Sequence, residues 1–140
     1  MMAYYIDDVI KELKALSIDT PRKPKLPDDK LLDKYEAKIG FRFSDDYRKF
    51  LKQASDVFVG VLNPLIVTES GDATSELAIA LSEAREMGLP NGWLPICEDN
   101  GDYYCLIENG KVCFWSHNGT TDELWPDLAT WIKVVWIEES

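Results

Sequence analysis

The stretch that decides the fold is WLPICEDNGDYYCLIENGKVCFWSH, residues 93–117. It contains three short apolar segments separated by Asn100-Gly101 and Asn109-Gly110. An Asn-Gly pair between apolar segments is typical of a β-hairpin with a two-residue type I′ turn, because that turn needs positive φ at both central residues. The stretch therefore predicts an antiparallel meander of three strands.

Two-residue loops also fix which side chains share a face of the sheet. Tyr104 is then expected opposite Cys97 and Trp115, and Cys105 opposite Phe114. The more apolar face is expected to form the core and carries Ile96, Tyr103, Cys105, Ile107, Val112 and Phe114. The other face is expected to be open and carries Cys97, Asp102, Tyr104, Leu106, Cys113, Trp115 and His117.

Helical periodicity dominates the sequence on both sides of this meander. Amphipathic helices are expected over residues 4–16, 28–39, 44–54, 74–88 and 126–139. Gly40 is expected just past the end of the second helix, Ser44 as the cap of the third, and Pro126 at the first position of the last. Two short β-branched segments, residues 57–62 and 65–68, predict two strands or one bent strand.

Together these elements predict an α+β fold. We expect an antiparallel β-sheet with helices packed mainly on one face, an N-terminal helical hairpin and a C-terminal helix. The 140 residues fit a single domain over residues 1–140, and 46% hydrophobic residues suffice for a buried core. No apolar run approaches the roughly 20 residues that cross a bilayer, so no membrane partner is expected.

The charge is unevenly distributed along the chain. Residues 1–54 carry a net charge of +2 and residues 55–140 a net charge of −12, which gives −10 in total. An acidic surface repels phosphates and attracts basic partners, so no nucleic acid partner is expected. The alternative is that the charge only keeps the protein soluble. The first residues lack the pattern of a secretory signal, and the cysteines are odd in number, so a cytoplasmic location is expected.

The cysteines and acidic residues of the meander do not have the spacing of a metal site or of a catalytic nucleophile. The expected register turns Cys105 away from Cys97 and Cys113, which lie two strands apart, so three free thiols are expected. His117 is too far from Cys113 for a Cys–His nucleophile. One histidine, no Cys-x-x-Cys and no calcium-loop spacing in EDNGD argue against a metal. No cofactor is therefore expected, although a pair of catalytic carboxylates of the glycosidase kind stays open in so acidic a chain.

The open face of the meander is the candidate binding surface. An aromatic anchor surrounded by acids is how protein interfaces often concentrate their binding energy. The expected partner-binding residues are Asp99, Asp102, Tyr104, Trp115 and His117. The alternative is a half-buried aromatic pair beside a weak surface ion pair.

Two blocks of the sequence resemble one known family. Residues 26–55 have Leu26-Pro27, a helix with Glu36 near its end, and Asp-Tyr-Arg-Lys-Phe-Leu at residues 46–51. Residues 93–119 have Leu-Pro-Ile, then Gly-Asp-Tyr-Tyr, then Trp115-Ser-His. Their order and spacing are similar to those of the SUKH superfamily, the Smi/Knr-type domain. The resemblance covers about residues 25–135, and this chain lacks the Asn-Gly-Gly that usually follows the second helix.

The resemblance implies an α+β fold and a protein without catalytic residues. Many bacterial members are immunity proteins that bind and neutralise toxins, often nucleases, and fungal relatives regulate cell-wall synthesis. The expected function is therefore a cytoplasmic immunity protein, not an enzyme, whose partner is a cognate toxin protein. A regulatory or scaffold domain with an endogenous protein partner is the alternative. An enzyme or small-ligand binder that uses the open face is the third reading.

Overall fold

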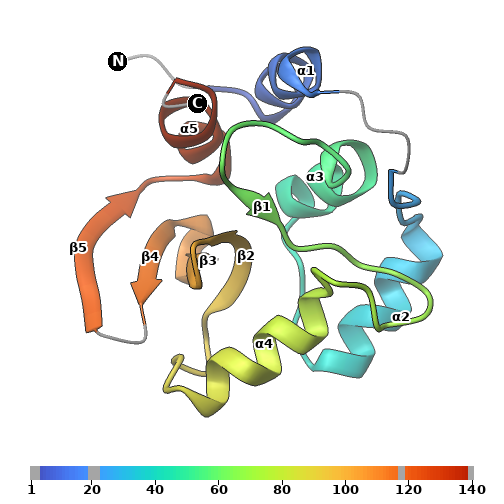
Figure 1. The fold of residues 1–140 in the computed structure, drawn as a ribbon, viewed down its shortest axis with the longest axis vertical. Helices are drawn as coiled ribbons and strands as arrows, with labels where there is room; N and C mark the ends of the chain where they lie inside the picture. The colour runs from blue at the N-terminus through green and yellow to red at the C-terminus, as the bar shows by residue number, and fades with distance from the viewer. Residues whose placement is uncertain (1–3, 19–22, 117–118, 139–140) are drawn as a thin grey trace.

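A five-stranded antiparallel sheet extends from the middle of the structure to one edge (Figure 1). The computed structural model describes residues 4–18, 23–116 and 119–138. The strands follow one another in chain order and are β1 (Asn63–Pro64), β2 (Leu94–Asp99), β3 (Asp102–Leu106), β4 (Val112–Ser116) and β5 (Gly119–Trp125). The predicted three-stranded meander is confirmed as β2–β4, and the predicted α+β class is confirmed with it.

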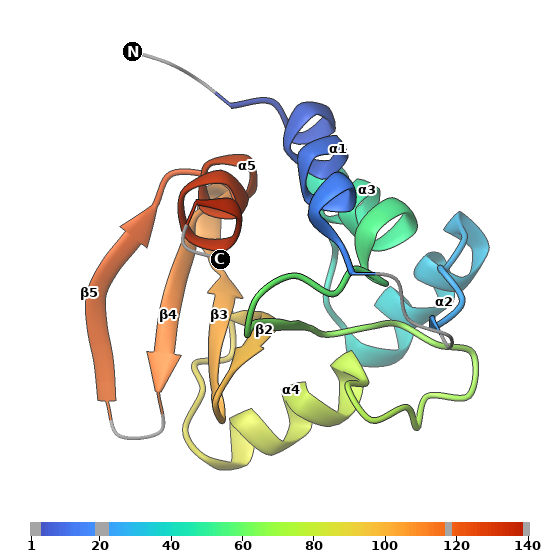
Figure 2. The ribbon, with the colours of Figure 1, turned by 45° about the horizontal axis from the view of Figure 1, so that its top comes forward.

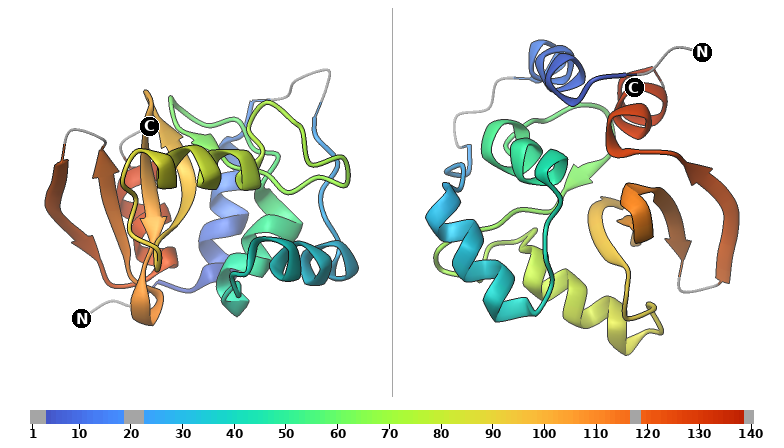
Figure 3. Two further views of the ribbon diagram at one scale, coloured as in Figure 1. Left: turned by 90° about the horizontal axis from the view of Figure 1, so that it is seen from below. Right: turned by 180° about the vertical axis from the view of Figure 1, so that it is seen from behind.

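Helices lie on both sides of this sheet. They are α1 (Ile6–Leu16), α2 (Asp29–Ile39), α3 (Asp45–Ala54), α4 (Leu77–Glu86) and α5 (Leu128–Trp131), which continues as a π-helical segment, η2 (Ile132–Ile137). Seen from below, α4 crosses in front of the strands and α5 lies behind them (Figure 3). The helices α1 and α3 pack against each other and against α5 and η2 (Figure 2). No helix in the described part of the chain is long and apolar enough to cross a membrane.

Local capping explains where the helices begin and end. The Asp28 carboxylate accepts a hydrogen bond from the Leu31 N–H at 2.8 Å, and Gly40 ends α2 with φ +69°. Ser44 caps α3 as predicted. The prediction that Pro126 is the first residue of the last helix is wrong by two positions, because α5 begins at Leu128 and Asp127 is its cap. The Asp127 carboxylate accepts from the Thr130 N–H at 2.7 Å, which a proline ring cannot do.

The first hairpin has the predicted turn. Asn100 and Gly101 have φ of 53° and 91°, and Cys97 pairs with Tyr104 as expected. A β-bulge between Pro95 and Cys97 then shifts the register, so Cys105 pairs with Pro95. A bulge inserts one extra residue into a strand and turns the rest of it by one position.

The second hairpin differs from the prediction by one residue. Its loop contains three residues, Glu108–Gly110, closed by a hydrogen bond from the Ile107 N–H to the Lys111 carbonyl at 2.9 Å. The expected pairs of Tyr104 with Trp115 and of Cys105 with Phe114 are therefore wrong. Tyr104 pairs with Phe114, Cys105 with Cys113, and Tyr103 with Trp115. Because side chains alternate along a strand, the one-residue slip moves Trp115 and Cys113 to the face opposite Tyr104.

The strands predicted over residues 57–62 and 65–68 are largely absent. Only Asn63–Pro64 pairs with β2, and Ile66 forms a single bridge with Glu76. The apolar residues of these segments are buried without a continuous ladder; they include Val57, Val59, Leu65 and Val67. Burial, not strand pairing, produced their alternation. The edge strand β5 was not predicted, because its sequence GTTDELW is polar apart from its last two residues.

Candidate functional site

Three of the five predicted binding residues lie together at the tip of the first hairpin. Asp99 and Asp102 are paired across the strands, and Tyr104 shares their face of the sheet. Asp99 and Tyr104 line a small hollow of about 130 Å³. The Tyr104 ring lies against the rings of Phe114 and Trp131, with centroids 4.9 and 5.0 Å away. Tyr104 is therefore held rigidly by the core and presents only part of its ring.

Trp115 does not lie on this surface. It is on the opposite face, only 4% exposed, with its ring stacked on that of Tyr103 at a centroid distance of 6.3 Å. The expectation that Trp115 is an exposed anchor is wrong, because the three-residue loop reversed its face. His117 lies outside the described residues, so its predicted place beside Asp102 stays a prediction.

An exposed apolar loop takes the place that the sequence assigned to Trp115. Residues 57–62 connect α3 to β1, and Val61 is 80% exposed and Phe58 51% exposed. Val61 lines the same hollow as Asp99 and Tyr104. We define the hairpin-loop surface as Val61, Asp99, Asp102 and Tyr104. Its composition is an apolar side chain and a half-buried tyrosine beside two carboxylates. The VFVGV alternation gave no signal for the exposure of Val61, because Val61 follows buried Val57 and Val59 at the same spacing and is expected inside; Gly60, with φ of 61°, interrupts the alternation before it.

The buried carboxylate of Glu76 is a second feature that the sequence did not reveal. Glu76 precedes the first turn of α4, and it is 1% exposed. Its carboxylate accepts hydrogen bonds from the Tyr35 hydroxyl at 2.6 Å, the Thr68 N–H at 3.1 Å, the Thr68 hydroxyl, and the Ala73 N–H at 3.3 Å. The Tyr35 hydroxyl in turn accepts from the Ala78 N–H at 2.8 Å. A buried charge is tolerated when its lone pairs are satisfied in this way.

This network joins three separate parts of the chain. Tyr35 belongs to α2, Thr68 and Ala73 to the loop before α4, and Ala78 to α4 itself. Burial, followed by the hydrogen bond to Glu76, raises the pKa of Tyr35 well above its usual value. Tyr35 therefore remains a neutral donor throughout the physiological range. The carboxylate acts as a structural clamp between α2 and the loop formed by residues 68–73.

Two residues of the family-like blocks form an ion pair. Arg48 on α3 contacts Glu36 on α2 at 2.6 Å, and its second terminal nitrogen contacts Asp29 and Asp33 at 3.0 Å each. Hydrogen bonding, first of all to Asp29, raises the pKa of Arg48 further above its usual value. The Glu36–Arg48 pair therefore joins the two helices of the predicted hairpin.

The three cysteines are free and buried. The prediction of free thiols agrees with this, but its geometric reason was wrong, because Cys105 and Cys113 lie directly opposite each other on neighbouring strands. Burial raises the pKa of Cys113 to about 11, and burial likewise raises the pKa values of Cys97 and Cys105. Thiols of this kind are poor nucleophiles, since the thiolate is the reactive form. Within the described residues, no three His, Cys, Asp or Glu side chains gather as metal ligands.

An open antiparallel sheet and a helical hairpin joined by the Glu36–Arg48 ion pair define a small α+β domain. A family model described as SUKH_5, SMI1-KNR4 cell-wall, matches residues 6–137. The chain therefore belongs to the SUKH family, and the resemblance found in the sequence is confirmed.

Structural comparison finds a related protein of the same fold. The chain is similar to a solved structure described as a protein from Pseudomonas syringae pv. tomato, with 32% sequence identity and a TM-score of 0.86. The likeness covers 94% of this chain and 98% of that one. A comparison with curated proteins finds no match.

Proposed function

We propose that this SUKH-family domain is a cytoplasmic immunity protein that binds and neutralises a cognate toxin of the nuclease type. It acts by binding and not by catalysis. The contact is made by the hairpin-loop surface, which retains Asp99, Asp102 and Tyr104 from the sequence prediction and replaces Trp115 with Val61. The observation that carries the proposal is the 80% exposure of Val61 in the hollow that Asp99 and Tyr104 also line.

The physical argument rests on what such a toxin presents. A nuclease binds phosphates with cationic groups, so its active site attracts a carboxylate surface of the matching shape. The two carboxylates of the hairpin tip would speed the encounter, since complementary charge mainly raises association rates. The apolar side chain of Val61 and the ring of Tyr104 would then be desolvated at the centre of the contact and slow dissociation.

A second candidate function follows from the family description, SMI1-KNR4 cell-wall. A regulatory or scaffold domain would use the same surface to hold an endogenous protein. The two functions differ in the partner and not in the surface, so the identity of the bound protein distinguishes them.

The experiment is co-purification with the product of the neighbouring gene, followed by kinetic binding measurements on variants. Val61→Ser is expected to weaken binding by about tenfold, mainly through faster dissociation. Leu124→Ser is the matched control, because Leu124 is also an exposed apolar residue but lies on edge strand β5. Its affinity should stay within about twofold of the wild type.

The charge contribution has its own pair of variants. Asp99→Asn with Asp102→Asn is expected to slow association and to flatten its dependence on salt. Glu83→Gln with Glu86→Gln removes the same charge from α4 and should leave the rate nearly unchanged. Equal effects of the two pairs would show that only net charge matters and would contradict the proposed surface. If the protein co-purifies with an endogenous protein and protects against no toxin, that result would favour the second function.

A further inference from the structure

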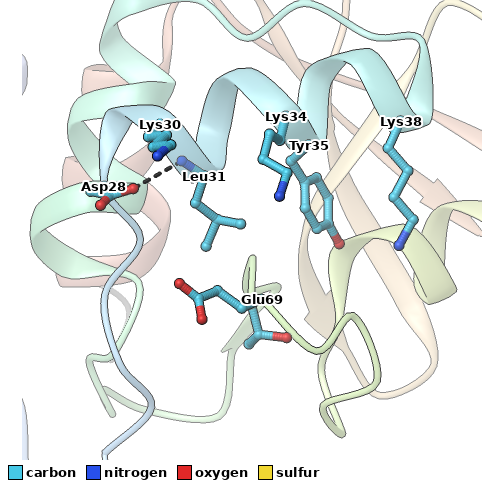
Figure 4. A pocket seen from close by; sticks show the side chains of 8 residues that line it. Asp28, Lys30, Leu31, Lys34, Tyr35, Lys38 and Glu69 are labelled. Carbon is cyan, nitrogen blue, oxygen red and sulfur yellow. Dashed lines mark hydrogen bonds between the residues drawn. The ribbon is translucent and has the colours of Figure 1, made fainter.

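A groove runs between α2 and the loop formed by residues 68–73, away from the hairpin-loop surface. Its first part is a hollow of about 500 Å³ lined by Asp28, Lys30, Leu31, Lys34, Tyr35, Lys38, Thr68 and Glu69 (Figure 4). Its second part is a hollow of about 450 Å³, which shares Asp28, Leu31, Thr68 and Glu69 with the first and extends to Lys25 and Ser70. Together they form one elongated depression with apolar Leu31 at its centre.

The groove is basic, although the protein carries a net charge of −10. Four lysines line it, at positions 25, 30, 34 and 38, against the two carboxylates of Asp28 and Glu69. The Asp28 carboxylate already accepts the Leu31 N–H, so it is engaged in capping α2. Positive charge concentrated at one place in an acidic protein requires a reason beyond solubility.

Three of the groove lysines, Lys30, Lys34 and Lys38, lie in a row along α2, and the fold does not neutralise them. The acids of α2 at positions 29, 33 and 36 turn toward Arg48 on the other side of the helix. Other lysines have partners; Lys49 pairs with Asp7, Lys52 with Asp29, and Lys133 with Glu12. Lys30, Lys34 and Lys38 have no ion pair with any residue that the structure describes, and Lys38 instead lies over the Tyr35 ring at 5.8 Å.

The floor of the groove is rigid. Tyr35 and Thr68, which both line it, are hydrogen-bonded to the buried carboxylate of Glu76. The Gly71 N–H also donates to the Thr68 hydroxyl at 3.1 Å, which holds the loop in place. A preformed site loses less conformational freedom on binding than one that must be assembled.

We propose that this groove binds an extended acidic segment of a partner protein, with Asp or Glu at alternate positions. The lysines are four residues apart, which on a helix is about 6 Å per step. Side chains on one face of an extended chain are two residues apart, about 6.7 Å. Three acids at alternate positions therefore match the three lysines in register. Leu31 faces the apolar parts of the segment, and Glu69 on the opposite wall can accept a backbone N–H.

The proposal does not depend on the immunity function, because the groove and the hairpin-loop surface share no residue. The test uses the full chain and three fluorescein-labelled probes measured by fluorescence anisotropy at low and physiological salt. The first is a peptide with Glu at alternate positions. The second has the same composition with its Glu residues in one block, and the third is a single-stranded oligonucleotide of equal charge.

Two triple variants decide the result. The row variant combines Lys30→Gln, Lys34→Gln and Lys38→Gln, and the control combines Lys49→Gln, Lys52→Gln and Lys133→Gln. Both remove three exposed or half-exposed cations, and circular dichroism checks that both fold. The alternating peptide is expected to bind the wild type about tenfold more tightly than the row variant, and within about twofold of the control.

The outcomes are separate. Tighter binding of the alternating than of the blocked peptide, lost only in the row variant, supports the proposal. Equal loss in both variants would show an effect of net charge and overturn it. Preference for the oligonucleotide would make the groove a polyanion site and would also overturn it. So would the absence of saturable peptide binding up to about 1 mM, the weakest affinity that such a contact could usefully have.

Discussion

The substitution Tyr35→Phe removes one oxygen atom from the centre of the Glu76 clamp and leaves the ring in place. That hydroxyl makes two hydrogen bonds, one donated to the Glu76 carboxylate at 2.6 Å and one accepted from the Ala78 N–H at 2.8 Å. After the substitution Glu76 keeps the two donors of Thr68 and that of Ala73. The carboxylate therefore loses one hydrogen bond but is not left without partners.

The expected cost combines two losses. A hydrogen bond to a charged group contributes about 1.5–3 kcal/mol, and the half-buried Ala78 N–H loses an acceptor that water replaces only in part. We expect Tyr35→Phe to lower the free energy of unfolding by about 3 kcal/mol. In a double-mutant cycle with Glu76→Gln, the two residues should show a coupling energy of about 1–2 kcal/mol, because they share one hydrogen bond.

The chain supplies a matched control in Tyr47. This tyrosine is fully buried, and its hydroxyl has no hydrogen-bond partner among the described residues. Tyr47→Phe removes the same atom but breaks no bond, so the free energy of unfolding should change by less than about 0.5 kcal/mol or increase. Urea denaturation followed by both tryptophan fluorescence and circular dichroism gives the two values.

The comparison can refute the reasoning directly. Equal costs for Tyr35→Phe and Tyr47→Phe would mean that loss of a buried oxygen, and not loss of a hydrogen bond, sets the energy. A cost below about 1 kcal/mol for Tyr35→Phe would mean that Glu76 is solvated or protonated and that no clamp holds α2 to the loop. The groove described above would then lack a rigid floor.

Trp115→Ala is expected to lower the free energy of unfolding by about 4 kcal/mol, because it leaves a cavity beside Tyr103. Urea denaturation measures this loss, and a loss below about 1 kcal/mol would place the Trp115 ring on an open face. Gly40→Ala should cost about 1 kcal/mol, since φ is +69° and no other atoms lie near its Cβ position; an unchanged midpoint of unfolding would argue against that strain. Titration of the denatured protein without reductant should give three thiols, and a single thiol would reveal a disulfide. Burial raises the pKa of Cys113 from 9.0 to about 11, so the unfolded chain releases its proton first and stability should fall as pH rises through this window. Cys113→Ala should make that fall shallower, and an identical pH profile would contradict the shift.

Features that depend on neighbouring residues were predictable from the sequence. Asp28 caps a helix whose first N–H groups lie three residues away, and Asn100-Gly101 closes a turn between directly adjacent strands. In such cases the residue types alone restrict the backbone, because few residues adopt positive φ or supply a short acceptor.

The proposed binding surface was harder to predict, because the register of β4 depends on one residue of loop length. Asn109-Gly110 has the composition of a two-residue loop, yet Glu108 joins it and the hairpin closes over three residues. Nothing in the local sequence distinguishes these two closures strongly. The slip of one position buried Trp115 and moved Cys113 to the face that Cys105 occupies. A site inferred from strand alternation is therefore only as secure as the loop that sets the register.

The basic groove was missed for a different reason, which concerns how charge is counted. Residues 1–54 carry a net charge of only +2, so their sum indicates no strong field. In the folded protein the acids and the lysines of α2 lie on different sides of the helix. Arg48 takes the acids on one side, and the lysines on the other side remain without ion pairs among the described residues. Arg48 lies 12 residues from Glu36 and 19 from Asp29, beyond the reach of the i, i+4 rule that pairs charges along a helix. The local electrostatic field therefore depends on which charges form ion pairs in the folded protein. A segment that is nearly neutral in sequence can still present a strongly charged groove.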